Sequence, residues 1–169
     1  MSYPGAHAAT APDRPAVVMA GTGAVLTYGQ LEDRSARLAA ALHITGLRSG
    51  DVIALLTDNT ATAFEVYWAA LRSGLYITAI NWHLAPEEAA YIVSDSGAKV
   101  VFCSAGVRDL GEQVAKIEKE IRGGLAGHRI VRRDRATLFG DLTGRVQPGD
   151  ASESGTVDVG LGGLDIAVE

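Results

Sequence analysis

The chain is poor in cysteine and in long apolar runs. Its 169 residues include a single cysteine, Cys103, which excludes an intrachain disulfide and is typical of a reducing compartment. No apolar run approaches the roughly 20 residues that cross a bilayer. The N-terminal stretch MSYPGAHAATAPDRP lacks the basic and apolar regions of a secretory signal. We therefore expect a cytoplasmic protein without a transmembrane segment.

Positive charge is also scarce. Lysine and arginine total 15 against 20 acidic residues, so the net charge is -5 and the isoelectric point is near 5.3. This balance argues against nucleic acid as a partner, because such proteins carry a basic patch. Hydrophobic residues make up 47% of the sequence, which is enough for a globular core, and the length fits one domain.

Strand and helix patterns alternate through the middle of the chain. The continuous apolar run VIALL, residues 52–56, predicts a strand covered on both faces. Further strand patterns follow in LYITAI, AKVVFCS and HRIVR, and helical periodicity separates them in TATAFEVYWAALRSG, APEEAAYIVSDSG and DLGEQVAKIEKEIRGG. This alternation, from about residue 50 to residue 132, predicts an α/β fold with a mostly parallel sheet and helices on both faces.

A hairpin and a long helix are predicted upstream of that region. AVVMAGTGAVLTY indicates two short strands around Gly21-Thr22-Gly23, and TYGQLEDRSARLAAALHITG has the period of a helix. Thr27 and Gln30 have the spacing of a capping box at its start. Leu31, Leu38 and Leu42 recur on one face of this helix.

Three later helix signals can be read from single residues. Thr62 and Glu65 have capping-box spacing at the start of the second helix, and Asp109 is a capping residue for the last one. Pro86 fits the first turn of the third helix. The large apolar residues of the second helix lie on one stripe: Phe64, Tyr67, Trp68 and Leu71.

We predict three segments along the chain. Residues 1–11 are expected to be a flexible N-terminus, and residues 12–145 to form the folded part. Residues 146–169 are rich in glycine and acidic residues, contain no lysine or arginine and show no sustained period. This composition predicts a disordered tail.

Two glycine clusters resemble phosphate-binding loops only in part. Gly21-Thr22-Gly23 lacks the third glycine of a dinucleotide fingerprint and is followed by a strand pattern, so a hairpin turn is favoured over a phosphate site. Gly123, Gly124 and Gly127 follow a helix and precede a strand, which is typical of a stop signal and a loop.

The candidate chemical residues are scattered. Cys103 ends a buried strand, and a buried thiol is favoured over a nucleophile. Trp82 and His83 follow a strand, where they either line a pocket or, more often, pack the loop onto the domain. None of the histidines has a partner at metal-ligand spacing: His7, His43, His83 and His128. We predict no catalytic, cofactor-binding or metal-binding residue in this chain.

Two stretches resemble a known family. LTYGQLEDRSARLAAAL, residues 26–42, is similar to the first core motif of the adenylate-forming acid–CoA ligases, and AALRSGLYITAINWHLAPEEAAYIVSDSGAKVVFCS, residues 69–104, is similar to the second. GDVIALLTDNTATAFEVYWAAL links them in the family's order. The resemblance runs from about Pro12 to Arg132 and is closest to the fatty-acid and medium-chain acyl-CoA synthetases.

The resemblance implies both an activity and a place in a larger fold. The family activates a carboxylic acid with ATP and magnesium, giving an acyl-adenylate and pyrophosphate, and coenzyme A then takes the acyl group. In the family this region is one α/β lobe of a larger N-terminal domain. The matching motifs are structural, so no catalytic residue of the family has a matching position here.

The family's phosphate loop, an S-G-T-T-G-x-P-K-G run, is expected next in the sequence. Here Ser154-Gly155-Thr156 is followed by Val157 and Asp158, and the second threonine, the proline and the lysine are absent. Asp158 repels a phosphate, so the Ser154 stretch is interpreted as a coincidence or a decayed remnant.

Three functional hypotheses follow from these observations. The first is an inactive fragment of such a ligase, which lacks the phosphate loop and the family's C-terminal domain. The second is a non-catalytic binding or assembly module that docks with a complementary or related ligase chain, or self-associates, through an exposed apolar face. A small enzyme of new activity is disfavoured, because no acid–base or nucleophile cluster appears.

Overall fold

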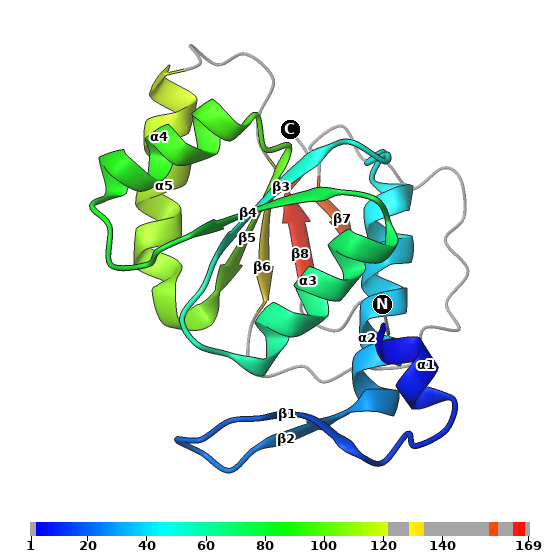
Figure 1. The fold of residues 1–169 in the computed structure, drawn as a ribbon. Helices are drawn as coiled ribbons and strands as arrows, with labels where there is room; N and C mark the ends of the chain where they lie inside the picture. Colours follow the sequence, from blue (N-terminus) through cyan, green and yellow to red (C-terminus); the bar gives the residue numbers. More distant parts are fainter. Residues whose placement is uncertain (1–2, 122–128, 134–155, 159–163, 168–169) are drawn as a thin grey trace. The chain divides into compact units, whose positions relative to one another are not determined.

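The computed structural model describes residues 3–121, 129–133, 156–158 and 164–167 (Figure 1). The chain divides into two compact units. The helical unit comprises Met1–Asp51 and Asn59–Ile77, and the sheet unit comprises Val52–Asp58 and Thr78–Glu169.

The helical unit opens with a short helix and a hairpin. Helix α1 covers Pro4–Ala8, and strands β1, Pro15–Val18, and β2, Val25–Thr27, pair antiparallel with Val18 opposite Val25. The predicted hairpin is therefore confirmed.

Helix α2, Tyr28–Ile44, begins with the predicted capping box. The Thr27 hydroxyl accepts a hydrogen bond from the Gln30 backbone N–H at 3.3 Å, and the Gln30 side-chain oxygen accepts one from the Thr27 N–H at 3.1 Å. The predicted leucines of this helix are buried: Leu31, Leu38 and Leu42. Local capping and apolar period therefore agree, which is why the sequence located this helix well.

Helix α3, Ala61–Arg72, exists as predicted but starts differently. Its N-cap is Thr60, whose extended backbone leaves Thr62 inside the first turn, so the predicted Thr62–Glu65 capping pair is wrong. Glu65 is instead buried and faces Arg34 of α2. A charged partner attracts a carboxylate more strongly than a neutral backbone donor does, which explains the difference.

Large residues of α3 do not form its buried face. The buried positions are Glu65, Val66, Ala69 and Ala70. The predicted stripe lies beside them, and two of its members, Phe64 and Leu71, are 45% and 54% exposed.

The sheet unit is built on parallel strands. Strand β3, Val52–Leu56, pairs parallel with β5, Val100–Ser104, and β5 pairs parallel with β6, Arg129–Arg133. The strand order is β4-β3-β5-β6-β8-β7, where β4 covers Tyr76–Ile80. The predicted parallel core of the sheet is confirmed.

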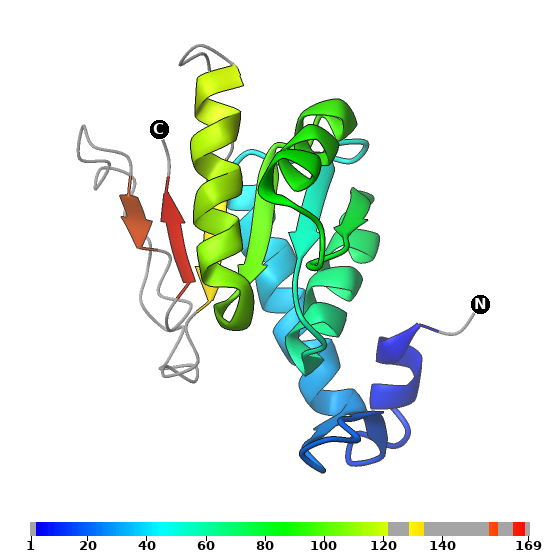
Figure 2. The same cartoon turned by 90° about the vertical axis from the view of Figure 1, so that its left-hand side faces the viewer.

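Both faces of the central strands are buried. Ala54, Leu56, Val101 and Cys103 point to one face and form a core with helices α4, Pro86–Ser96, and α5, Arg108–Ile121. These two helices lie side by side in both views (Figure 2). The alternate residues of the strands are buried as well: Ile53, Leu55, Val100 and Phe102. The apolar run of β3 therefore lies in a strand that is buried on both faces, as the sequence predicted.

Both ends of α4 and the start of α5 can be compared with the remaining residues that were predicted to begin or end a helix. Pro86 is in the first turn of α4, and Gly97 caps its end in the left-handed conformation with φ 65°, both as expected. A short 3₁₀ helix η1, Ala105–Val107, runs directly into α5, so the chain is already helical before Asp109. The predicted Asp109 cap is therefore wrong, and Asp109 lies in the first turn of α5.

Parts of both terminal segments have regular structure. Within residues 1–11, α1 is helical and Pro4 is buried. Within residues 146–169, strands β7, Thr156–Asp158, and β8, Leu164–Ala167, pair antiparallel, and β8 pairs antiparallel with β6. The flexible N-terminus over residues 1–11 and the disordered tail over residues 146–169 stay predictions. The domain boundaries at residues 11/12 and 145/146 stay a prediction.

Within the described part of the chain, no helix combines the length and apolar character that a membrane crossing requires.

Candidate functional site at the carboxyl ends of β3 and β5

Ligands of parallel α/β sheets usually bind beyond the carboxyl ends of the strands. In the sheet unit, β3 continues into Thr57 and Asp58, and β5 ends at Ser104 and continues into η1. Leu56 and Cys103 are opposite each other in the parallel register. Asp58 and Ser104 therefore leave adjacent strands at the same edge of the sheet.

Asp58 and Ser104 bind each other reciprocally. The Ser104 hydroxyl donates to Oδ1 of Asp58 at 2.6 Å and accepts a hydrogen bond from the Asp58 backbone N–H at 3.3 Å. Gly106 lies against the other oxygen, because a Cβ atom at Gly106 would come within 2.3 Å of Asp58 Oδ2. The carboxylate is thus held against the first turn of η1. It puts negative charge where an α/β fold would otherwise receive an anion.

Cys103 lies just before this pair and is buried. Its Sγ donates a weak hydrogen bond to the Val107 carbonyl oxygen at 3.4 Å, and its side chain is 8% exposed. Gly111 of α5 makes room for the sulfur, because a Cβ atom there would lie 2.5 Å from Sγ. The sequence indicated a buried thiol here, and the structure has one.

Trp82 and His83 occupy the turn between β4 and α4. Their ring centroids lie 3.7 Å apart with the ring planes tilted by 32°, and the His83 backbone N–H donates to the Asn81 side-chain oxygen at 3.0 Å. Trp82 is 39% exposed and His83 is exposed, so the pair does not bury itself against the domain.

His7 and His43 are far apart in the chain, and each contacts a different residue. The His7 ring lies 4.8 Å from the Tyr28 ring, and the His43 carbonyl oxygen accepts a hydrogen bond from Arg48 at 2.8 Å. His128 and the glycines Gly123, Gly124 and Gly127 lie outside the described residues. Across the residues that the structure describes, no group of three or more histidine, cysteine, aspartate or glutamate side chains has metal-site geometry.

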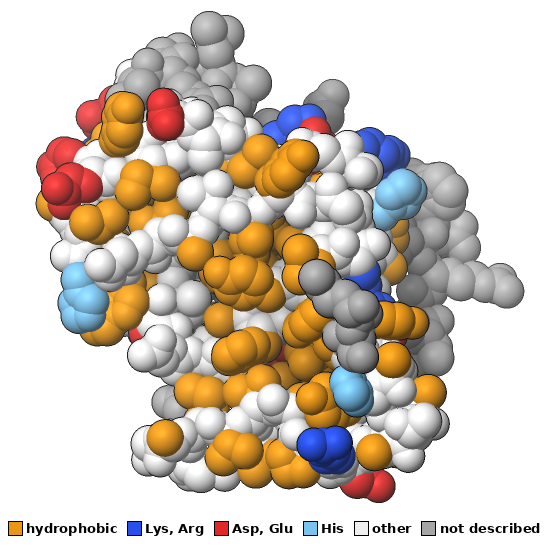
Figure 3. Space-filling model, in the orientation of Figure 1, with side chains coloured by type: hydrophobic (Ala, Val, Ile, Leu, Met, Phe, Trp, Pro, Cys, Tyr) orange, Lys and Arg blue, Asp and Glu red, His pale blue; other side chains and the backbone are white. Residues whose placement is uncertain are grey.

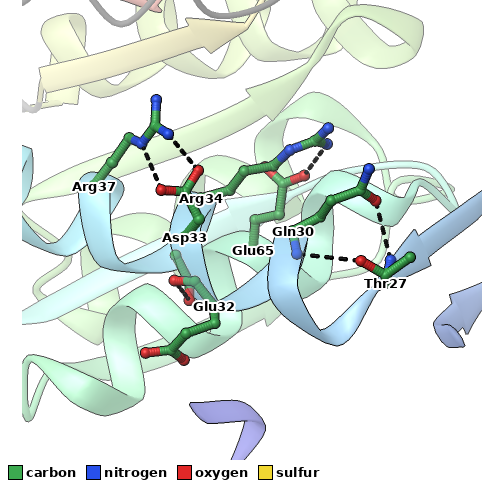
Figure 4. Close-up of polar contacts among 8 residues, drawn as sticks. Thr27, Gln30, Glu32, Asp33, Arg34, Arg37 and Glu65 are labelled. Carbon is green, nitrogen blue, oxygen red and sulfur yellow. Dashed lines mark hydrogen bonds and ion pairs between the residues drawn. The ribbon is translucent and has the colours of Figure 1, made fainter. Parts of the chain in front are cut away.

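Charged side chains of the helical unit pair with one another (Figure 4). Arg34 Nη1 lies 3.1 Å from Glu65 Oε1, and the Glu65 side chain is only 3% exposed. Arg37 binds Asp33 one turn earlier in α2, with Nε 2.9 Å from Oδ1. These arginines are engaged with carboxylates and are not presented to a phosphate.

A second ion pair also joins α2 to α3, between Glu32 and Arg72. Sequence reasoning missed the interhelical pairs, because it assigned Glu65 to a helix cap. The available signal was a glutamate flanked by Phe64 and Val66 inside an apolar helix, which is a costly position unless a cation faces it.

That the Ser154 region does not bind the phosphates of ATP stays a prediction. Thr156 opens β7 and Asp158 closes it, while Ser154 and Gly155 lie outside the described residues. Residues 146–169 hold no lysine or arginine, so this segment itself contributes no cation to a phosphate. No step of an adenylation reaction is therefore assigned to side chains of this chain.

Comparison with known proteins decides the family. The model of the AMP-binding enzyme family matches residues 5–152. The chain belongs to the AMP-binding enzyme family. Several relatives are named as acid–CoA ligases, in agreement with the resemblance of the two core stretches.

Curated relatives of this chain are named for different acids. A fatty acid–[acyl-carrier-protein] ligase of Streptomyces coeruleorubidus is 36% identical over 96 residues, 57% of this chain and 18% of its own length. A 4-coumarate–CoA ligase of Humulus lupulus is 34% identical over 119 residues, 70% of this chain and 20% of its own. A long-chain-fatty-acid–CoA ligase of Mycobacterium tuberculosis is 35% identical over 99 residues, 59% of this chain and 20% of its own. The chain thus spans about a fifth of the length of the curated relatives it matches.

Solved structures agree on the fold. A benzoate CoA ligase from Burkholderia xenovorans LB400 superposes with a TM-score of 0.64 at 24% identity, covering 75% of this chain and 24% of that one. The anthranilate CoA ligase AuaEII superposes with a TM-score of 0.60 at 25% identity, covering 72% of this chain and 22% of that one. The α/β lobe expected from the sequence is therefore the fold of this chain.

Proposed function

We propose that this chain provides the N-terminal α/β lobe of an ATP-dependent acid–CoA ligase. In the proposed reaction a carboxylate attacks the α-phosphate of ATP, forming an acyl-adenylate and releasing pyrophosphate; a thiol then displaces AMP. The observation that supports the proposal is the family match over residues 5–152. The proposal includes a cytoplasmic location, consistent with the single Cys103.

Residues 1–169 by themselves are proposed not to form the adenylate. Adenylation needs cations and backbone donors around the phosphates, because charge develops there during transfer. The Ser154 stretch supplies no cation, and Arg34, Arg37 and Arg72 are paired with carboxylates. ATP, magnesium and coenzyme A would then be bound by ligase polypeptide outside these residues.

The test compares this chain with a chimera. Residues 1–145 are joined to the part of the Humulus lupulus 4-coumarate–CoA ligase that follows its matched segment. Both proteins are assayed for acid-dependent exchange of pyrophosphate into ATP with magnesium and with fatty, 4-coumaric and 3-hydroxybenzoic acids. The chain alone should give the no-enzyme rate, and the chimera should exchange with at least one acid.

The control is the same chimera with the lysine of the donor's phosphate loop replaced by alanine, which should abolish exchange. Exchange by the 169-residue chain alone would contradict its proposed inactivity. A folded chimera that exchanges with no acid would contradict the assignment of residues 1–145 to a ligase lobe. Thioester formation with coenzyme A or with acyl carrier protein then identifies the acceptor, since the relatives differ in this respect.

A docking role is the second candidate function. It is favoured by large apolar side chains that stay exposed in the helical unit, including Phe64 and Leu71. Contiguous apolar surface marks an interface more often than a free surface. Under this alternative the chain associates with a complementary or related ligase chain, or with a copy of itself, and contributes no chemistry.

A further inference from the structure

Strand β6 of the sheet unit has arginines where its neighbour is mostly apolar. Its sequence, Arg129–Arg133, is RIVRR, whereas that of β5 is VVFCS. Parallel pairing with β5 satisfies one side of β6. The other side would present a row of unpaired backbone N–H and C=O groups, and such an edge can add a strand from another chain. This edge is therefore a site of strand addition unless another strand covers it.

The chain's own strand β8 covers this edge. β8 pairs antiparallel with β6, and β7 pairs antiparallel with β8, so this end of the sheet has the order β5-β6-β8-β7 (Figure 1). The outermost strand is then β7, which is three residues long and ends at Asp158. Short edge strands that carry a charge resist further pairing.

Charge favours the observed register of β8. Arg132 of β6 is opposite Asp165 of β8. Residues of opposite charge at directly opposite positions stabilise an antiparallel pair, and residues of like charge destabilise it. A slip of two residues, which keeps the faces of the strand, would place Asp165 opposite Ile130 or Asp134 instead. Arg132 therefore favours β8 in this register.

A second copy of β6 is a poorer partner for the same edge. An antiparallel pair of two β6 strands centred on Val131 would place Arg129 opposite Arg133 at both ends, and like charges oppose that pairing. Strand β8 supplies an aspartate, and residues 134–155 join β6 covalently to the β7–β8 pair. A tethered strand competes at an effective concentration on the order of millimolar, so a free strand at micromolar concentration should not displace it.

We propose that β8 is a built-in edge guard: it occupies the strand-addition edge of β6 within the same chain and keeps extended segments of other polypeptides off the sheet. The β6 edge is then a strand-addition site that prefers an acidic residue opposite Arg132. The inference is independent of the ligase activity, because it concerns only the pairing of β6, β8 and β7.

Strand β7 offers a matched comparison. Asp158 of β7 is opposite Asp165 of β8, so Asp165 is flanked in register by an arginine on one side and an aspartate on the other. Asp165→Lys would place like charges opposite each other on β6 and β8. Asp158→Lys would replace a like pair on β7 and β8 by an opposite pair. The same change should therefore open the β6 edge at one position and keep it closed at the other.

Amide hydrogen exchange of the full 169-residue chain measures closure of the edge. The β6 amides that pair with β8 should be protected in the wild type. Asp165→Lys should lower their protection about three- to tenfold, as expected for reversal of one cross-strand charge pair. The charge exchange Arg132→Asp with Asp165→Lys should restore the protection, and Asp158→Lys should leave it unchanged or raise it.

An apolar dye is not a suitable probe of this edge. Figure 3 shows apolar side chains gathered over α3 and over the β1–β2 hairpin. The exposed large apolar residues of these elements are Val18, Val25, Phe64 and Leu71. A dye would bind such a surface whether β6 is covered or open.

A fluorescein-labelled peptide with the sequence of residues 156–169 tests directly whether an opened edge accepts a strand. It should bind the Ile166→Pro variant at least about tenfold tighter than it binds wild type, because a proline in β8 removes a ladder hydrogen bond and releases β6. The same peptide carrying Asp165→Lys should bind that variant more weakly. Thermal unfolding establishes that each variant is folded, and the charge variants keep the test valid if Ile166→Pro is not.

Four outcomes would overturn the proposal. The first is free exchange of the β6 amides in the wild type, which a disordered tail over residues 146–169 would produce. The second is an equal loss of protection in Asp158→Lys and Asp165→Lys, because net charge and not register would then be the cause. The third is peptide binding to wild type as tight as to Ile166→Pro. The fourth is a wild-type dimer in sedimentation that Ile166→Pro disperses, because β8 of a second copy would then occupy the edge.

Discussion

Helix α4 of the sheet unit and helix α3 of the helical unit differ in which side chains they bury. In the sheet unit, α4 buries Ala89, Ala90 and Val93 completely, and these residues close a core with β3 and β5. In the helical unit, α3 buries Glu65, Val66 and two alanines and leaves Phe64 and Leu71 exposed. The difference shows that α4 places its apolar residues in a core, whereas α3 keeps two of its large apolar residues at the surface.

The largest expected effect contrasts two leucines. Leu56 of β3 is completely buried and Leu71 of α3 is 54% exposed. Leu56→Ala should lower the free energy of unfolding by about 3 kcal/mol, because it removes buried methyl groups and leaves a cavity. Leu71→Ala should change it by less than about 0.5 kcal/mol. Urea denaturation of both variants measures the contrast, and equal losses would contradict it.

The next effect concerns the buried ion pair. Arg34→Met should cost about 2–3 kcal/mol, because it removes the cation that faces the 3% exposed Glu65 carboxylate. Arg37→Met is the matched control, because Arg37 pairs with the exposed Asp33, and it should cost no more than about 0.5 kcal/mol. Thermal and urea unfolding compare the two variants. If Arg34→Met does not lower the free energy of unfolding, the Arg34–Glu65 ion pair does not hold α3 in place.

A smaller effect tests the close packing of the sheet unit. Gly111→Ala should cost about 2 kcal/mol, because the new Cβ would lie 2.5 Å from the Cys103 sulfur. In a Cys103→Ala background the same change should cost less, since the sulfur is gone and the two sites are coupled. A double-mutant cycle of urea unfolding gives the coupling. If the unfolding free-energy costs of the two substitutions are fully additive, contact with the Cys103 sulfur is not the cause of the cost of Gly111→Ala.

The smallest effect concerns the start of α2. Thr27→Ala removes the hydroxyl that accepts the Gln30 N–H and should cost about 1 kcal/mol. Thr27→Ser keeps the hydroxyl and should restore most of that loss. Thermal midpoints of the two variants provide the comparison. If Thr27→Ser is as unstable as Thr27→Ala, the Thr27 hydroxyl does not stabilise the helix as a cap.

Sequence signals between residues a few positions apart predicted most of the fold. The capping box at Thr27, the buried run of β3 and Pro86 at the start of α4 each depend on neighbours within a few residues, and all are found. The outward face of α3 was not predictable in this way. It depends on Arg34, which is 31 positions from Glu65 in sequence, and capping spacing misassigned that glutamate.

The candidate site shows the same limit. That Cys103 is buried follows from its strand, but the Asp58–Ser104 pair joins residues 46 positions apart, and only the parallel register of β3 and β5 brings them together. Strands β7 and β8 escaped prediction because their pairing with each other and with β6 is non-local and their glycine-rich surroundings are typical of a tail.

Amide hydrogen exchange of the chain alone and of the ligase chimera tests the central claim most directly. If the helical unit is built to be covered and the sheet unit is not, α3 amides should gain at least about tenfold protection in the chimera, with a smaller change in β3 and β5. Equal protection of α3 in both proteins would contradict the account, because it would mean that α3 needs no partner.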